Sequence, residues 1–180
     1  PPSLVEFGRL ASAGSGIVRM MTIAPEGKGA VSLIAAGLKR GIGMSIGHTL
    51  ASRSDVDAAV RAGATMATHL FNAMAPLHHR EENAPAAALV DDRLTCACIY
   101  DRFHIGRSAM TIAHRCKPRG RLMLVSDATS ALGAPDGSFE SDGVKYTVKA
   151  GQVKVRGTET LGGSAVSLLQ GVRNVVEDLG

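Results

Sequence analysis

Residues 64–74 read ATMATHLFNAM, a largely apolar run that meets a histidine at position 69 and an asparagine at position 72. The run 64–68 has the length and composition of a buried β-strand, which predicts that His69 stands at a strand end and Asn72 in the following loop. In parallel α/β folds the carboxyl ends of the strands form one rim, where ligands bind. The fold therefore depends on whether the other apolar runs are strands of the same kind.

Five short apolar runs, each bounded by turn residues, alternate with stretches of helical spacing. The runs cover 18–23, 43–47, 64–68, 95–100 and 122–126, and the helical stretches cover 29–40, 54–62, 84–91 and 108–117. This alternation predicts βαβ units and a parallel sheet. The strands are almost continuously apolar, which is typical of a sheet covered on both faces.

The composition changes after Asp127. Residues 130–143 are rich in Gly, Ser, Pro and Asp, and the runs 144–149 and 152–155 alternate with period two around a central Ala-Gly. This pattern predicts a β-hairpin outside the parallel sheet. Residues 164–179 carry an apolar stripe at helical spacing, so a closing helix is expected to start at Ser164, with the preceding glycine-rich stretch as a turn.

Composition narrows the class of protein and of ligand. The chain has 180 residues, 45% of them hydrophobic, and a net charge of +4 from scattered Lys and Arg. With two Tyr, four Phe and no Trp it offers few surfaces on which bases could stack, which disfavours nucleic-acid binding. No apolar run reaches the roughly 18 residues of a membrane helix. We predict a cytoplasmic protein with a small anionic substrate, in which Cys96, Cys98 and Cys116 are buried reduced thiols.

Three of the predicted strands end in a residue that can bind a metal or move a proton, namely His48, His69 and Asp127, and a fourth is followed closely by His104. Singly, a strand-end histidine is as readily a hydrogen-bonded or surface residue, and an Asp in this context is as readily a helix N-cap. Together, two imidazoles and a carboxylate are the groups with which zinc or iron hydrolases work. Arg80 follows the His69 strand in a loop that could reach the same rim and hold a phosphate. The remaining histidines, His78, His79 and His114, are interpreted as solvated.

At these residues the sequence resembles the N-acetylglucosamine-6-phosphate deacetylase family of the amidohydrolase superfamily. The resemblance rests on Thr22–Glu26, Ile46–Thr49, Thr68–Met74, Arg80-Glu81, Ser126–Ala128 and 157–164. It implies a metal-dependent (β/α)8 TIM barrel, only partly represented by about five parallel strands, with a β-hairpin from a small β-sandwich domain. The implied domains are a partial barrel catalytic domain at 1–138, the hairpin at 139–160 and a helix at 161–180 that returns to the barrel.

The resemblance assigns roles to the reactive residues. It implies that His48 and His69 bind a divalent metal, zinc with iron as the alternative, and that Asp127 is the general acid/base. The implied reaction splits the acetamide of N-acetylglucosamine 6-phosphate into glucosamine 6-phosphate and acetate. The alternatives are another amidohydrolase acting on a different N-acyl or cyclic amide, and an inactive fragment that binds a sugar phosphate.

The same resemblance implies how the substrate is held. Asn72 and Ala73 would bind it through the side-chain amide and the backbone, and Arg80 and His104 match positions that contact the sugar phosphate or hydroxyls. Arg80 would act across the interface of a homodimer, and the expected partners include no nucleic acid and no membrane. Arg102 stands where the family usually has Gly, and the family's metal-binding Glu motif does not occur in the 47 residues before His48. The substitution at Arg102 implies an altered substrate loop, and the missing motif implies that the chain is part of a longer polypeptide.

Overall fold

The computed structural model describes residues 2–14 and 16–180. The chain divides into two compact units, one formed by Pro1–Ala97 and Ala113–Met123, the other by Cys98–Ile112 and Leu124–Gly180. The domain boundaries after residues 138 and 160 stay a prediction. Among the described residues, each helix falls short of the length and hydrophobicity that a bilayer crossing requires.

The first unit contains nearly all of a parallel sheet with the strand order β1-β2-β3-β4-β5. Its strands are β1 (Met20–Ile23), β2 (Gly43–Ile46), β3 (Ala64–Ala67), β4 (Thr95–Cys98) and β5 (Leu122–Leu124). The register pairs Ile23 with Ile46 and Ile46 with Ala67, so the first three strands end at the same level. The predicted βαβ arrangement is confirmed, and residues that follow these strands share one edge of the sheet.

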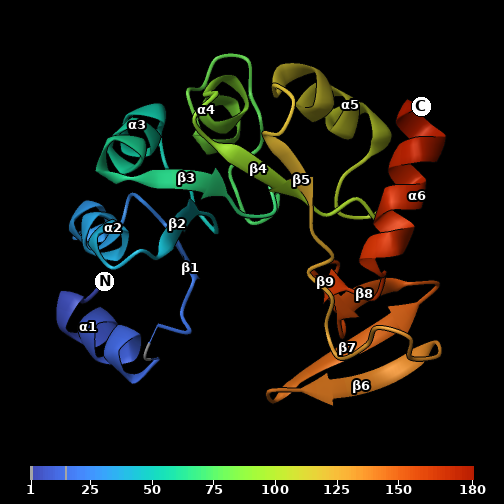
Figure 1. Ribbon diagram of the computed structural model, residues 1–180. Helices are drawn as coiled ribbons and strands as arrows, with labels where there is room; N and C mark the ends of the chain where they lie inside the picture. Colours follow the sequence, from blue (N-terminus) through green and yellow to red (C-terminus); the bar gives the residue numbers. More distant parts are fainter. Residues whose placement is uncertain (1, 15) are drawn as a thin grey trace. The chain divides into compact units, whose positions relative to one another are not determined.

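Helices α2 (Ala30–Lys39), α3 (Arg53–Ala62) and α4 (Ala84–Val90) lie along one side of this sheet (Figure 1). Their buried residues are mostly small or branched apolar side chains, as in α3, where Val56 and Ala59 are fully buried. Helix α3 starts at a capping box formed by Ser52 and Asp55 and ends at Gly63 in the left-handed conformation, which are strong local signals for both ends. Helix α1 (Leu4–Ala13) precedes β1 and was not predicted.

The second unit contains an antiparallel sheet with the order β6-β7-β8-β9. Its strands are β6 (Gly137–Ser141), β7 (Val144–Lys149), β8 (Gln152–Val155) and β9 (Leu161–Ser164). The hairpin predicted from the alternating pattern is β7 and β8, in which Val148 pairs with Val153. These two valines and Ala131 form a small buried cluster, so the hairpin is part of a sheet with its own core.

Two predictions made for local structure are wrong. The closing helix α6 is Leu168–Leu179 with Ser167 as its N-cap, and Ser164 belongs to β9 instead. The reason is that the Ser164 backbone N–H and C=O bond to the Asp127 C=O and the Thr129 N–H, at 3.0 and 2.9 Å, which commits the residue to pairing. Cys96 and Cys98 are buried as predicted, but Cys116 is exposed, because it lies on the solvent side of α5 (Arg107–Cys116).

Candidate active site

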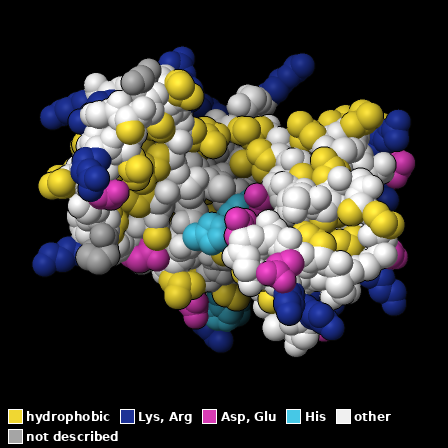
Figure 2. Space-filling model, turned by 90° about the horizontal axis from the view of Figure 1, so that it is seen from below, with side chains coloured by type: hydrophobic (Ala, Val, Ile, Leu, Met, Phe, Trp, Pro, Cys, Tyr) yellow, Lys and Arg dark blue, Asp and Glu magenta, His cyan; other side chains and the backbone are white. Residues whose placement is uncertain are grey.

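His48 and His69 lie side by side at one edge of the parallel sheet. His48 follows β2, His69 follows β3, and their ring centroids are 4.6 Å apart with the rings at 71° to each other. His69 is buried, whereas His48 is exposed. Histidine side chains reach the surface on the face seen in Figure 2, where Lys and Arg side chains are dispersed. The parallel register therefore brings together two imidazoles that are distant in sequence.

The backbone at these positions is left-handed, although neither residue is glycine. The φ angles are 49° at His48, 31° at His69, and 76° and 49° at Phe71 and Ala73 in the loop after β3. Non-glycine residues rarely adopt positive φ, and they concentrate where the surrounding structure holds a functional geometry. Gly47 shows how tight the site is, because a Cβ there would lie 2.9 Å from the Thr68 Cβ. A side chain at position 47 would displace the strand that carries His69.

Asn72 and Ala73 are held against the His69 loop by their own hydrogen bonds. The Asn72 side-chain amide donates to the C=O groups of His69 and Leu70, at 3.3 and 3.2 Å. The C=O of Ala73 accepts from the Thr49 N–H at 2.9 Å, which joins the loop after β3 to the loop after β2. Arg80 lies exposed on the loop that leads to α4. The roles of these three residues toward a substrate stay predictions.

His104 and Asp101 form a hydrogen-bonded pair in the second unit. His104 Nδ1 lies 2.7 Å from Asp101 Oδ2, and the two side chains are only 6% and 3% exposed. Asp101 Oδ1 also accepts from the backbone N–H groups of Phe103 and His104. Burial by itself would raise the Asp101 pKa, but the hydrogen bonds from His104 and Phe103 outweigh it and lower the pKa below its ordinary value. An ionised Asp101 can only accept, so Nδ1 carries a proton, which in a neutral imidazole leaves Nε2 as the acceptor.

Asp127 is exposed and has a left-handed backbone with φ 47°. Its C=O is anchored by the Ser164 N–H of β9 at 3.0 Å. The described residues between β5 and β6 contain no helix, so Asp127 is not a helix N-cap. The close packing next to Asp127 requires a glycine at position 163. A Cβ at this position would lie 2.6 Å from Thr129 Cγ2 and 3.1 Å from the Asp127 carbonyl oxygen. That Asp127 acts together with the two histidines stays a prediction.

The paired imidazoles supply part of what a metal site needs. Neutral imidazole is a common ligand of zinc and iron, and the two rings lie next to each other, with centroids 4.6 Å apart. Among residues 2–14 and 16–180 no group of three or more His, Cys, Asp or Glu side chains could hold a metal. The donor set therefore fits a two-histidine portion of a divalent metal site.

Comparison with known proteins assigns the chain to a family. It is 39% identical over 169 residues to N-acetylglucosamine-6-phosphate deacetylase of Homo sapiens. The aligned region covers 91% of this chain and 41% of the relative. A solved structure from Mycobacterium smegmatis, of a mutant N-acetyl-D-glucosamine-6-phosphate deacetylase in complex with N-acetyl-D-glucosamine-6-phosphate, matches 99% of this chain and 47% of that chain at 38% identity and a TM-score of 0.96. The chain belongs to the N-acetylglucosamine-6-phosphate deacetylase family.

Further comparisons define how far this assignment reaches. The chain spans about two fifths of the length of the curated relatives it matches. An N-acetylgalactosamine-6-phosphate deacetylase of Escherichia coli O157:H7 is 32% identical over 174 residues, which is 97% of this chain and 46% of that relative. No protein-family model matches the chain.

At Arg102, where the resemblance to the deacetylase family predicts a glycine, the backbone φ is 69°. The guanidinium binds Asp178 at 2.9 Å and Glu177 at 2.8 Å, both near the end of α6. Tyr100 also donates to Asp178, at 2.7 Å. Burial and the Asp178 carboxylate raise the Tyr100 pKa to about 12, so the phenol keeps its proton. These contacts tie the segment that carries Asp101 and His104 to α6.

We expect Arg102→Gly to be less destabilising than Arg102→Ala, because both lose the ion pairs but only glycine adopts positive φ freely. The difference should be about 2–4 °C in Tm, measured by thermal unfolding at pH 7. The hydrogen bonds from Arg102 and Tyr100 lower the Asp178 pKa. A carboxyl group whose pKa is lowered in the folded state stabilises the fold. This stabilisation is fully present above the ordinary Asp pKa of about 3.9, and it is lost as the pH falls through the lowered pKa of the folded state.

The Tm gap between the wild type and Arg102→Gly should therefore shrink below about pH 4. Equal Tm values for the glycine and alanine variants would show that the backbone at position 102 is not strained.

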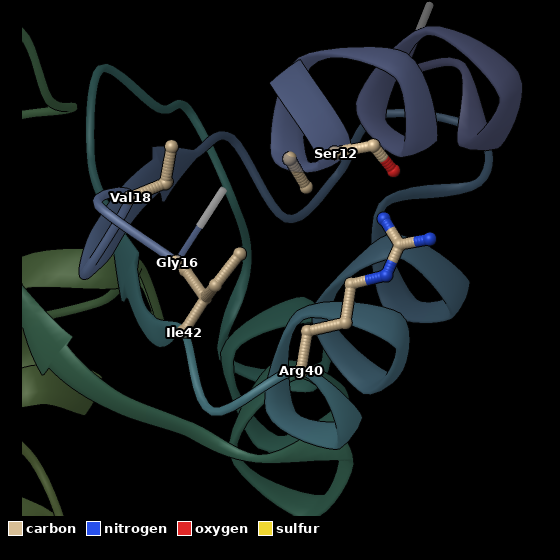
Figure 3. Close-up of a pocket in the computed structure, with 6 residues that line it drawn as sticks. Ser12, Gly16, Val18, Arg40 and Ile42 are labelled. Atoms are coloured by element: carbon tan, nitrogen blue, oxygen red, sulfur yellow. The ribbon is translucent and has the colours of Figure 1, made fainter. Parts of the chain in front are cut away.

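A small pocket lies at the opposite edge of the parallel sheet, where strands begin. Its volume is about 240 Å³, and Figure 3 shows Arg40 reaching toward it beside Ile42, with Ser12 at the end of α1. Val18 and Ile42 come just before β1 and β2. In barrels of this kind the amino ends of the strands serve stability rather than chemistry, so the pocket is separate from the histidine edge.

Sequence reasoning missed the residues that support the reactive side chains. Glu26 and Thr49 bond to each other beside His48, Asp101 orients His104, and Gly163 with Ser164 backs Asp127. The only feature of the sequence that could have indicated these residues is their position. Each lies within a few places of a strand end or in the glycine pair before Ser164. Their roles depend on hydrogen bonds between loops, which no spacing in one segment encodes.

Proposed function

We propose that the chain carries part of the active site of an enzyme that hydrolyses the acetamide of N-acetylglucosamine 6-phosphate to glucosamine 6-phosphate and acetate. The observation that carries the proposal is the pair of left-handed histidines at adjacent strand ends, 4.6 Å apart, in a chain that belongs to the deacetylase family. His48 and His69 would hold the divalent cation, zinc or iron. When bound, such a cation supplies Lewis acidity toward the acetamide carbonyl and a water molecule.

Residues of the chain would transfer the proton and hold the substrate. A carboxylate oxygen of Asp127 would take a proton from the attacking water and return it to the amide nitrogen, which must be protonated to leave as an amine. His104, held by Asp101, would accept a hydrogen bond from a sugar hydroxyl through Nε2. Asn72 and the backbone of Ala73 would orient the substrate next to His69. Arg80 would bind the phosphate group of the substrate. In a homodimer, this would be the substrate held by the neighbouring subunit.

The direct test is acetate release by the purified protein, compared on N-acetylglucosamine 6-phosphate, N-acetylgalactosamine 6-phosphate and unphosphorylated N-acetylglucosamine. The second substrate is a candidate because of the Escherichia coli relative. Preference for the first phosphorylated sugar, with zinc or iron found by metal analysis, is the expected result. Exclusive activity on an unphosphorylated N-acyl substrate would contradict the proposal, and binding without turnover would favour a sugar-phosphate binder.

We expect Arg80→Ala to raise KM for N-acetylglucosamine 6-phosphate by about 10- to 100-fold, the loss typical of a hydrogen-bonded charge pair. KM for unphosphorylated N-acetylglucosamine should stay nearly unchanged, because that sugar offers no phosphate. Arg119→Ala, at another exposed loop position, is the matched control. Equal effects of Arg80→Ala on both sugars would remove the phosphate role.

A further inference from the structure

Glu26, in the loop after β1, uses both carboxylate oxygens to hold the segment that follows His48. The Thr49 hydroxyl donates to Oε2, and the Leu50 N–H donates to Oε1 at 2.9 Å. Glu26 is exposed, but Thr49 is only 2% exposed. The contact therefore reaches from the surface to a buried hydroxyl beside the candidate metal ligand.

Thr49 connects this contact to the loop after β3. Its N–H donates to the Ala73 C=O at 2.9 Å, and its hydroxyl accepts from the Ala51 N–H at 3.0 Å. Thr49 also forms a parallel bridge with Met74. One residue thus joins the loops that follow β1, β2 and β3, and it is the direct neighbour of His48.

The neighbouring backbone needs such support. His48 has φ 49° and Ala73 also has φ 49°, conformations that an unrestrained chain would leave for the right-handed or extended regions. Each Glu26 oxygen already accepts a hydrogen bond from the His48 loop. The hydrogen bonds of Glu26 are those of a residue that fixes a loop. Its carboxylate binds Thr49 and Leu50 and not the imidazole of His48 or His69 in the hydrogen bonds of the described residues.

We propose that Glu26 and Thr49 are a positioning pair that holds the His48 ring against His69. The pair acts through the backbone of Thr49 rather than by contact with the rings. Its consequence for metal binding rests on the function proposed above, whereas its consequence for the ring geometry does not. Residues that orient metal ligands typically change metal affinity by 10- to 100-fold when removed.

The test uses the metal-free protein and NMR cross-relaxation between the ring protons of His48 and His69, which are close enough to give a signal. We expect the signal in the wild type and in Thr49→Ser, which keeps the hydroxyl. It should be lost in Thr49→Val, which is isosteric but has no donor, and weakened in Glu26→Gln, which keeps one acceptor oxygen. An unchanged ring signal in both Thr49→Val and Glu26→Gln would overturn the proposal.

A control separates positioning from general loss of stability. Ser52→Ala removes the N-cap of α3 and lowers stability without touching the Glu26 contact, so it should keep the ring signal. Loss of the signal in Ser52→Ala as well would also overturn the proposal. Zn²⁺ titration forms the second arm, with affinity expected to fall about 10- to 100-fold in Thr49→Val and to be restored in Thr49→Ser. If the wild type binds no Zn²⁺, the proposed metal site fails while the ring signal still decides the role of the pair.

Discussion

We expect Asp127→Asn to lower turnover of N-acetylglucosamine 6-phosphate by about 10²- to 10⁴-fold, the contribution usual for a general acid/base. The amide of Asn cannot take the proton of water and cannot return it to the leaving amine. Asp and Asn both tolerate the left-handed backbone, so the substitution should spare the φ of 47° at this position. Steady-state kinetics together with bound-metal analysis would measure the effect.

Asp142→Asn is the matched control for this substitution. Asp142 is also exposed and left-handed, with φ 52°, but it lies in the turn between β6 and β7. Turnover and metal content should both stay at the wild-type level in the control. In Asp127→Asn the metal content should be retained. Loss of metal together with turnover would recast Asp127 as a ligand, and unchanged turnover would exclude it from proton transfer.

The second large effect concerns stability. Lys117 is buried, and its Nζ donates to the C=O groups of Ala88 and Asp91 at the end of α4, at 3.0 and 2.7 Å. Lys117→Met keeps the length of the side chain but leaves two carbonyls without their charged donor. We expect it to cost about 2–4 kcal/mol and to lower Tm by roughly 5–15 °C, measured by thermal or denaturant unfolding.

Lys28→Met provides the comparison, because Lys28 is exposed and such substitutions typically change stability by at most about 0.5 kcal/mol. A Lys117→Met variant as stable as Lys28→Met would show that the buried ammonium gives no net stabilisation. This result would be informative, since removing a buried charge also removes its desolvation cost.

The parallel sheet could be predicted because its signals are local. Each strand is a short apolar run ended by a turn, and each predicted helix after a strand is found within one or two residues of its expected ends. The positions of His48 and His69 at strand ends also predicted that the two residues lie close together, since parallel strands end at one edge of the sheet. Lys117 shows the limit of such reasoning. It directly follows the last residue of α5, in a stretch rich in basic residues, and no local pattern predicts its burial, which depends on the Ala88 and Asp91 carbonyls at the end of α4.

Ser164 shows the same limit for secondary structure. A serine before an apolar helical stripe is a good N-cap signal, but pairing with the backbone around Asp127 draws it into β9 and delays the helix to Leu168. The backbone of a residue can serve only one set of partners, and those partners lie 35 or more residues away. Local pattern could not show that they were present.

The sequence by itself determined the order of the five parallel strands and of the helices between them, the strand-end positions of the reactive residues and the membership in the deacetylase family. These follow from the period of apolar residues and from short motifs, which are properties of neighbouring residues. Only the tertiary structure decided the 4.6 Å contact of His48 with His69, the link from Glu26 through Thr49 to Ala73 and the burial of Lys117. Each of these depends on hydrogen bonds and packing between segments that are distant along the chain, and such contacts exist only once the strands have paired in register.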